Sequence, residues 1–152
     1  MIPDQIEREI LIEAPVDVVW RIVTEPDQIV QWFSDEAEFD PRPGGEGHLR
    51  FKGSDQYAIE VEAVEPPRRF AFRWAYAHDS RPRERSSMLV EFTLQQEADK
   101  TRVRVVESGF DKVDWSDDEM AKYAEKHGSG WSHHLGRLRD FAKRDLKPAP
   151  RK

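Results

Sequence analysis

The sequence has no cysteine and no long apolar run among its 152 residues. Without cysteine there can be no disulfide, no thiolate nucleophile and no cysteine-ligated zinc or iron–sulfur cluster. No segment approaches the roughly 18 consecutive apolar residues of a membrane-spanning helix. No apolar run follows a basic start at the N-terminus, as it would in a secretory signal. We therefore expect a cytoplasmic protein with no membrane span.

The short motifs that hold metals, phosphates or nucleophiles are also missing. No two histidines have His-x-x-x-His spacing, and the adjacent His133 and His134 would point about 100° apart on a helix, too far to bind one ion together easily. The glycines of 44–47 lead into an expected strand, unlike a phosphate-binding loop, which opens a helix. No Gly-x-Ser-x-Gly motif occurs. We expect no metal and no cofactor.

Basic residues are not in excess, since the formal net charge is −6 and the isoelectric point is near 5.4. Nucleic-acid binding is not expected, because phosphate neutralisation needs a concentrated basic surface. The basic clusters at 81–85 and 143–152 fit a solvated loop and a tail. Five tryptophans and eight phenylalanines provide large apolar side chains for one core. We predict a single domain over 1–147 and a flexible basic tail over 148–152.

Alternation of apolar and polar residues predicts that much of the chain is β-strand. The expected strands cover residues 5–12, 37–40, 48–51, 57–64, 69–76, 87–95 and 101–108. The clearest alternation places four aromatic side chains on one face of 69–76, namely Phe70, Phe72, Trp74 and Tyr76. Because the connecting loops are short, neighbouring strands should pair antiparallel.

Helical spacing predicts two short helices early in the chain and a long one near its end. Pro15 favours a helix start before 16–23, and a second short helix is expected around 29–33. Residues 128–130, Gly-Ser-Gly, should break or kink a helix that starts near Ser116, so that the main helix begins at Trp131 and ends near residue 146. Its apolar stripe consists of Trp131, Leu135, Leu138 and Ala142, with His134 and Phe141 at the edge.

Several short segments occur in a familiar order between about residues 5 and 145. They are Ile12-Glu13-Ala14-Pro15, Val19-Trp20, Thr24-Glu25-Pro26, Trp32-Phe33, Pro43-Gly44-Gly45, Glu65-Pro66-Pro67-Arg68-Arg69-Phe70, Phe72-Arg73-Trp74, Glu107-Ser108-Gly109-Phe110 and Gly130-Trp131 with Leu135 and Leu138. In this order they resemble the family of proteins related to the activator of the heat-shock-protein-90 ATPase. That family is part of the SRPBCC, or START-like, superfamily.

The resemblance implies an α+β helix-grip fold. In this fold a curved antiparallel sheet of about six or seven strands surrounds a long C-terminal helix, and two short helices follow the first strand. The resemblance also implies a cavity between the sheet and the helix. The superfamily includes lipid and hormone binders and cyclases, so function has to be argued from the site.

Our leading hypothesis is a protein that binds a small apolar or amphipathic molecule in that cavity, without covalent chemistry. The motivating pattern is a face of inward aromatic side chains opposite one helical stripe. The residues expected to line the ligand are Trp32, Phe33, Phe72, Trp74, Tyr76, Glu107, Trp131, His134, Leu135 and Leu138. The protein could act as a monomer or a homodimer.

Glu107 is the least expected of these residues, because alternation places its carboxylate inward with Val103 and Val105. An unpaired buried charge is costly, so the carboxylate needs a partner. Arg8 lies on the apolar side of the first strand and is one candidate for a structural ion pair. A cavity carboxylate that orients a polar ligand is another interpretation, and a bulge that turns Glu107 into solvent is a third.

Two further functions remain open at the level of sequence. One is an enzyme of the cyclase or hydrolase kind, with Glu107, Tyr76 and His134 as candidate acid, base or orienting groups around one cavity. The other is an interaction module for a chaperone or another protein partner. Such a module would use the outer face of the sheet or the loop at 81–85.

Overall fold

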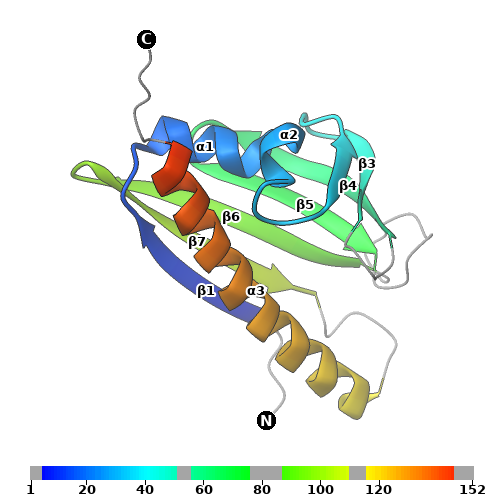
Figure 1. Cartoon of the computed structure of the whole chain (residues 1–152). Helices are drawn as coiled ribbons and strands as arrows, with labels where there is room; N and C mark the ends of the chain where they lie inside the picture. Colours follow the sequence, from blue (N-terminus) through cyan, green and yellow to red (C-terminus); the bar gives the residue numbers. More distant parts are fainter. Residues whose placement is uncertain (1–4, 51–55, 76–86, 110–115, 146–152) are drawn as a thin grey trace.

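A computed structural model describes residues 5–50, 56–75, 87–109 and 116–145, and its centre is one antiparallel sheet (Figure 1). The strands lie in the order β1-β7-β6-β5-β4-β3-β2. Their bounds are β1 Gln5–Ile12, β2 Glu36–Phe39, β3 Glu46–Arg50, β4 Gln56–Glu65, β5 Arg69–Ala75, β6 Ser87–Glu97 and β7 Lys100–Ser108. The sheet has seven strands, which confirms the predicted antiparallel architecture.

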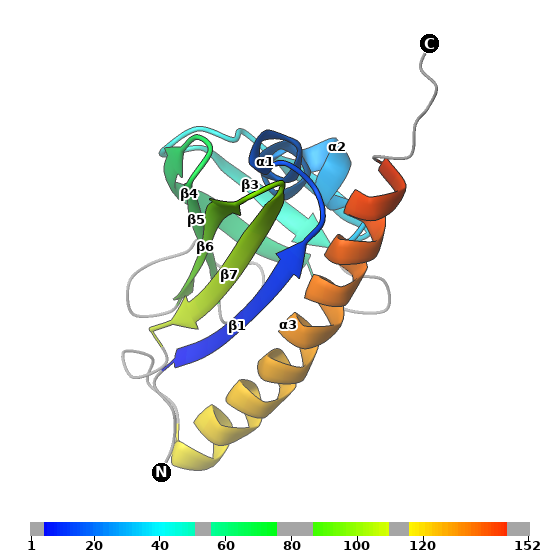
Figure 2. The ribbon, with the colours of Figure 1, turned by 90° about the vertical axis from the view of Figure 1, so that its left-hand side faces the viewer.

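Helices cover one face of this sheet and leave the other bare (Figures 1 and 2). They are α1 Val16–Thr24, α2 Pro26–Ile29 and α3 Asp117–Asp145. Helix α3 packs along β1, whereas α1 contacts β6 and β7 and α2 contacts β2. On this one face α3 lies along β1, and the two short helices lie beside it over other strands. This arrangement confirms the helix-grip prediction.

The first strand completes the sheet by pairing with the last one. Gln5 lies opposite Ser108, and Ile12 lies opposite Thr101. Just beyond β1, the hydroxyl of Thr101 donates a 2.7 Å hydrogen bond to the carbonyl of Ala14, which joins the turn before α1 to β7. The other strand pairs join neighbours in sequence. Strands β2 to β7 therefore form a meander, and β1 pairs with β7 as the edge strand of the sheet.

Alternation along the strands separates a buried face from a charged one. In β7 the side chains of Val103, Val105 and Glu107 are buried, whereas those of Arg102 and Arg104 are partly exposed. The buried side chains face the helices and form the core. The partly exposed side chains lie on the helix-free face, where arginines pair with glutamates. Strand parity thus assigns the side chains of β7 to their faces, whereas in β4 a register shift between Val61 and Ala63 brings Val64 against the core as well.

Two helix predictions were wrong in detail. Helix α3 runs unbroken from Asp117 to Asp145, through the glycines expected to interrupt it. A glycine inside a helix costs only about 1 kcal/mol relative to alanine, less than the burial of Trp131 or Leu138 contributes. Helix α2 begins at Pro26, not near Ile29, because proline suits the first helical position.

Some of the sequence predictions fall outside the described residues. These are the side chain of Tyr76, the loop at 81–85 and the basic tail at 148–152. Within the described ranges, no helix is both long and apolar enough to cross a membrane.

Candidate functional site

Glu107 is a carboxylate in the centre of the core. The parity of β7 directs it inward, and its side chain is fully buried. Its Oε1 accepts a 2.8 Å hydrogen bond from the indole Nε1 of Trp131, and its Oε2 accepts a 2.9 Å hydrogen bond from Nε1 of Trp74. One carboxylate therefore connects α3, β7 and β5.

The two hydrogen bonds to Glu107 satisfy both the buried carboxylate and the buried indole N–H groups. An indole N–H can donate a hydrogen bond but cannot accept one, and a buried donor without an acceptor costs about 1–3 kcal/mol. Glu107 provides an acceptor oxygen to each indole, and the two donors partly replace the water that the carboxylate loses on burial. The contact also fixes the orientation of both indole rings. In this structure Glu107 acts as an anchor for Trp74 and Trp131.

The ion pair between Arg8 and Glu107 suggested by the sequence does not form between these two described residues. In the β1–β7 ladder Glu107 lies opposite Ile6, and Arg8 lies two residues further along, opposite Val105. The Nε of Arg8 donates a 3.2 Å hydrogen bond to the hydroxyl of Ser132 on α3. Strand β1 is at the edge of the sheet, and the long arginine lies along the flank of α3, beside Ser132 and the buried Gly128.

Phe33 fills the space beside the two indoles. Its ring lies 5.2 Å from that of Trp131, with 17° between the planes, and 6.0 Å from that of Trp74, with 29° between the planes. On another side it stacks on Trp32 at 5.2 Å. Phe33 lies in the turn that follows α2, and not on the sheet or on α3. A side chain from a short connecting segment therefore completes the aromatic cluster of Trp32, Phe33, Trp74 and Trp131.

His134 lies at the rim of the aromatic cluster. Its ring meets Phe33 edge-on at 4.8 Å and lies 6.1 Å from the ring of Trp131. His134 is half-buried, whereas the neighbouring His133 is exposed. The helical spacing predicted this difference. Among the described residues no group of three or more histidine, aspartate or glutamate side chains is placed to hold a metal ion.

The other residues expected to line a ligand are part of the closed core. Phe72, Leu135 and Leu138 are at most 3% exposed. They lie on the sheet and on the apolar stripe of α3, as alternation and helical spacing predicted. Within the described part of the site, the space between sheet and helix is thus occupied by side chains.

A small void remains on the side of Phe33 that faces the sheet and α1. It holds about 10 Å³ and is lined by Val23, Ile29, Trp32, Phe33, Phe39, Leu49, Ile59, Phe72 and Phe92. Its lining is entirely apolar, and its size is close to that of a single water. An organic ligand would fit only if a lining side chain moved.

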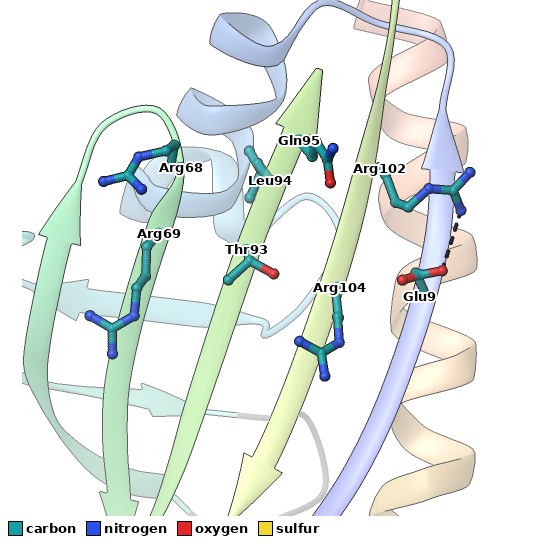
Figure 3. Close-up of a pocket in the computed structure, with 8 residues that line it drawn as sticks. All are labelled: Glu9, Arg68, Arg69, Thr93, Leu94, Gln95, Arg102 and Arg104. Atoms are coloured by element: carbon teal, nitrogen blue, oxygen red, sulfur yellow. Dashed lines mark hydrogen bonds and ion pairs between the residues drawn. The ribbon is translucent and has the colours of Figure 1, made fainter. Parts of the chain in front are cut away.

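A larger, open groove of about 390 Å³ lies on the helix-free face of the sheet (Figure 3). In one row across the strands, Arg69 lies opposite Thr93, Thr93 opposite Arg104, and Arg104 opposite Glu9. Figure 3 shows the arginine side chains on both sides of Thr93. The groove is lined by Glu9, Arg68, Arg69, Thr93, Leu94, Gln95, Arg102 and Arg104.

The arginines of this groove are already paired with carboxylates. Arg69 pairs with Glu91, and Arg68 with Glu65. The hydrogen bond from Arg104 holds the pKa of Glu7 below its ordinary value of 4.5. The hydrogen bonds from Arg102 lower the pKa of Glu97 in the same way. Because glutamates of the protein itself neutralise these guanidinium groups, we interpret the groove as a structural ion-pair network. Those glutamates are Glu7, Glu9, Glu65, Glu91 and Glu97.

Sequence reasoning missed two features of the site. One is Phe92, which lines the void and meets Trp131 edge-on at 5.7 Å. The alternation of β6 places it inward and could have identified it. The other is the shared hydrogen bonding of Trp74 and Trp131 to one carboxylate. Alternation assigns a side chain to a face of the sheet but does not give the rotamer that directs an indole N–H.

The sequence matches the family described as "Activator of Hsp90 ATPase homolog 1-like protein" over residues 13–143. Comparison with curated proteins gives no match.

Solved structures share the fold over most of the chain. The structure of MLL2253 from Mesorhizobium loti is 25% identical, with a TM-score of 0.78 over 92% of this chain and 97% of that one. DynU16, described as a protein in the dynemicin biosynthetic locus, is 28% identical, with a TM-score of 0.74 over 93% of this chain and 48% of that one. The Aha1 dimer from Colwellia psychrerythraea is 20% identical, with a TM-score of 0.72 over 90% of this chain and 93% of that one.

Proposed function

The chain belongs to the family of activator of Hsp90 ATPase homolog 1-like proteins, and from that premise we propose that it binds a small apolar or amphipathic molecule between the sheet and α3. The proposed binding site is the space that Phe33 occupies beside Trp74 and Trp131. The ligand would replace the Phe33 ring. No covalent chemistry is part of the proposal.

The position of Phe33 carries this proposal. Its ring is 4% exposed and contacts both indoles, yet it is attached to a turn outside the sheet and α3. A rotation of this one side chain toward solvent would join its volume to the void behind it without breaking a strand pair or a helix hydrogen bond. The opened space would have two indole faces on one side and an apolar lining on the other. Such a space suits a flat or chain-like apolar ligand.

The anchoring of the two indoles favours binding over catalysis. Both oxygens of Glu107 already accept hydrogen bonds from protein groups. An acid or base has to reach the substrate within hydrogen-bond distance, and Glu107 is 0% exposed. The helix-grip fold of this family supports a ligand-binding or a cyclase-like role. Of the two we propose ligand binding, with Glu107 as a positioning residue.

One comparison supports a small-molecule ligand. DynU16 is described by its place in a biosynthetic locus, and it matches almost all of this chain. A protein-interaction role would instead use the helix-free face or the loop at 81–85, which lies outside the described residues. Among the residues that the structure describes, arginines and glutamates on that face compensate one another in pairs, and this balance favours the small-molecule role.

Displacement of Phe33 sets a limit on affinity. If the open state is only a small fraction of the molecules, the apparent Kd rises by the inverse of that fraction. A smaller side chain at position 33 should therefore bind the same ligand more tightly. This expectation separates the Phe33 site from binding elsewhere on the protein.

The proposal can be tested by NMR of the indole N–H groups, with 2-naphthaleneethanol as a neutral probe. Saturable shifts are expected at Trp74 and Trp131, with little change at Trp20, which packs on Phe70. The Phe33→Leu variant should bind the probe about tenfold more tightly. Phe70→Leu makes the same change at another fully buried position, outside the void, and should leave the Kd unchanged. No saturable shift in either the wild type or Phe33→Leu would exclude this site.

A further inference from the structure

One lateral face of α3 borders the turn that follows α2. At about 100° per residue, Gly130, His134, Arg137 and Phe141 fall within about 60° of one another on the helix. The ring of His134 lies against Phe33. This face is next to the apolar stripe, so it forms the edge of the aromatic cluster.

Two contacts join this helix face to residues 31–34. His134 meets the ring of Phe33 edge-on at 4.8 Å, and one turn later Nη2 of Arg137 lies 3.5 Å from the carbonyl oxygen of Gln31. We name this region the α2–α3 seam, formed by residues 31–34 with Gly130, His134 and Arg137. Phe33 belongs both to the seam and to the proposed ligand site. A ligand that replaces Phe33 would therefore be exposed to solvent at the seam.

The seam contains unfilled space and an unused polar group. Gly130 is partly buried, yet a Cβ added to it would meet no heavy atom of the described residues within 4 Å. Ser34 is 3% exposed, and its hydroxyl has no hydrogen-bond partner in the part of the chain that the structure describes. A buried hydroxyl without a hydrogen-bond partner is costly, so an external partner for it would be favourable. The seam thus has space and hydrogen-bonding capacity beside Phe33.

Arg137 is the charged group of the seam, and no described carboxylate neutralises it. Its 3.5 Å contact with the Gln31 carbonyl is long for a hydrogen bond. Two residues further along the helix, Arg139 does have a carboxylate partner, since its Nε lies 3.3 Å from Asp140. The arginines of the helix-free face are paired as well. Arg137 can therefore offer its guanidinium N–H groups to an external acceptor.

From these observations we infer that the α2–α3 seam is a subsite for the anionic end of an amphipathic organic acid. The inference rests on the proposed function, since the apolar part of the ligand takes the place of Phe33. The carboxylate then lies at the seam, where the planar guanidinium of Arg137 forms two parallel hydrogen bonds with it. The ligand class is thus an aromatic or aliphatic carboxylic acid rather than a neutral hydrocarbon or alcohol.

A matched pair of probes tests this inference. 2-Naphthylacetate and 2-naphthaleneethanol have the same aromatic ring and the same number of carbon atoms, and they differ in the carboxylate. Wild-type protein should bind the acid about tenfold more tightly than the alcohol, because hydrogen bonds to charged groups are the stronger ones. In Arg137→Gln the two Kd values should become equal, with that of the alcohol unchanged. Arg139→Gln is the matched control and should keep the preference.

The possible outcomes separate the inference from the proposed function. Equal affinity for both probes in the wild type, or a preference that survives Arg137→Gln, overturns the anionic subsite and leaves the Phe33 site standing. Failure of both probes to bind wild type and Phe33→Leu overturns the proposed function, and the subsite with it. Higher salt should reduce the affinity for the acid and leave that for the alcohol unchanged.

The unfilled space gives a second test. Gly130→Leu would place a side chain in the seam and should weaken binding of both probes about tenfold or more, since the ligand would clash with it. Gly136→Leu is the control, because its Cβ also meets no described atom within 4 Å but lies on another face of α3. Equal binding by these two variants would contradict ligand entry at the seam.

Discussion

The indole of Trp131 donates a 2.8 Å hydrogen bond to Oε1 of Glu107, and this contact attaches α3 to β7 inside the core. The rest of the contact between α3 and the sheet is largely apolar, and apolar packing alone would allow the helix to slide or rotate. A buried polar pair has defined geometry and disfavours such shifts. The position of Trp131, and with it one side of the proposed ligand site, therefore depends on Glu107.

Removal of Glu107 should destabilise the protein strongly. In Glu107→Ala the N–H groups of Trp74 and Trp131 lose the acceptor that the structure shows for each, and a cavity forms as well. We expect the free energy of unfolding to fall by about 3–5 kcal/mol. Urea denaturation measures this loss, and Val105→Ala on the same face of β7 gives the effect of truncation alone. A loss no larger than that of the control would contradict the anchoring role.

Leu138→Ala should also destabilise the protein, for a simpler reason. Leu138 is fully buried on the apolar stripe of α3. Truncation in such a position costs about 2–5 kcal/mol. The change should appear as a lower urea midpoint at an unchanged slope. A value below about 1 kcal/mol would mean that the helix does not pack as described.

Gly136→Ala should stabilise the protein. Alanine has a helix propensity up to about 1 kcal/mol better than that of glycine, and the added methyl group would meet no atom within 4 Å in the part of the chain that the structure describes. Gly128→Ala is the informative comparison, because its Cβ would lie 2.6 Å from Nη2 of Arg8. The guanidinium would have to move, which offsets part of the gain. Thermal unfolding should rank Gly136→Ala above Gly128→Ala, and the reverse order would refute this account of the helix.

Stability should decrease in acid because of the ion pairs on the helix-free face. Hydrogen bonds from arginines lower the pKa of Glu7 and of Glu97 below 4.5 in the folded protein. At a pH near these values the unfolded chain binds more protons, so stability rises with pH there. The contribution of these ion pairs to the free energy of unfolding is present above pH 4.5. It is lost as the pH falls through the lowered pKa values of the two glutamates. Urea midpoints between pH 7 and pH 3 measure it.

The loss of stability in acid should depend on the arginine that pairs with each of these glutamates. Arg104→Gln removes the partner of Glu7 and should reduce the decrease in stability between pH 5 and pH 3. Arg137→Gln, which removes a cation without a described carboxylate partner, should leave the decrease unchanged. Because the pairs are exposed, added salt should also reduce it. A pH profile that is the same in all three proteins would contradict the assignment.

The sequence was sufficient to predict most strands and the antiparallel pairing of neighbours, but not the register shift in β4. Period-two alternation at 69–76 and 101–108 placed Phe72, Trp74 and Glu107 inward, and the structure agrees. Helical spacing likewise placed His134 nearer the core than His133. These predictions succeed because they depend only on the direction of each side chain from its own element.

The partners of these side chains could not be predicted in the same way. Whether Glu107 pairs with Arg8 or with two indoles depends on strand register, on rotamers and on how α3 crosses the sheet. Phe33 illustrates the same limit, since its contacts are set by the path of the turn after α2. Local patterns do not contain these long-range distances. The predicted break at the glycines of α3 was wrong because the low helix propensity of glycine costs less than tertiary packing contributes.

The pairing of β1 with β7 also has a consequence for biosynthesis. During synthesis β1 is made before its partner β7, and the other described strands are made between the two. Until β7 is made, the backbone N–H and C=O groups of β1 have no sheet partner. Unpaired strand groups of this kind can pair with another chain. Contacts so distant in sequence also slow folding. The glutamates at positions 7 and 9 add negative charge to β1, and this charge reduces the tendency of the unpaired strand to self-associate during synthesis.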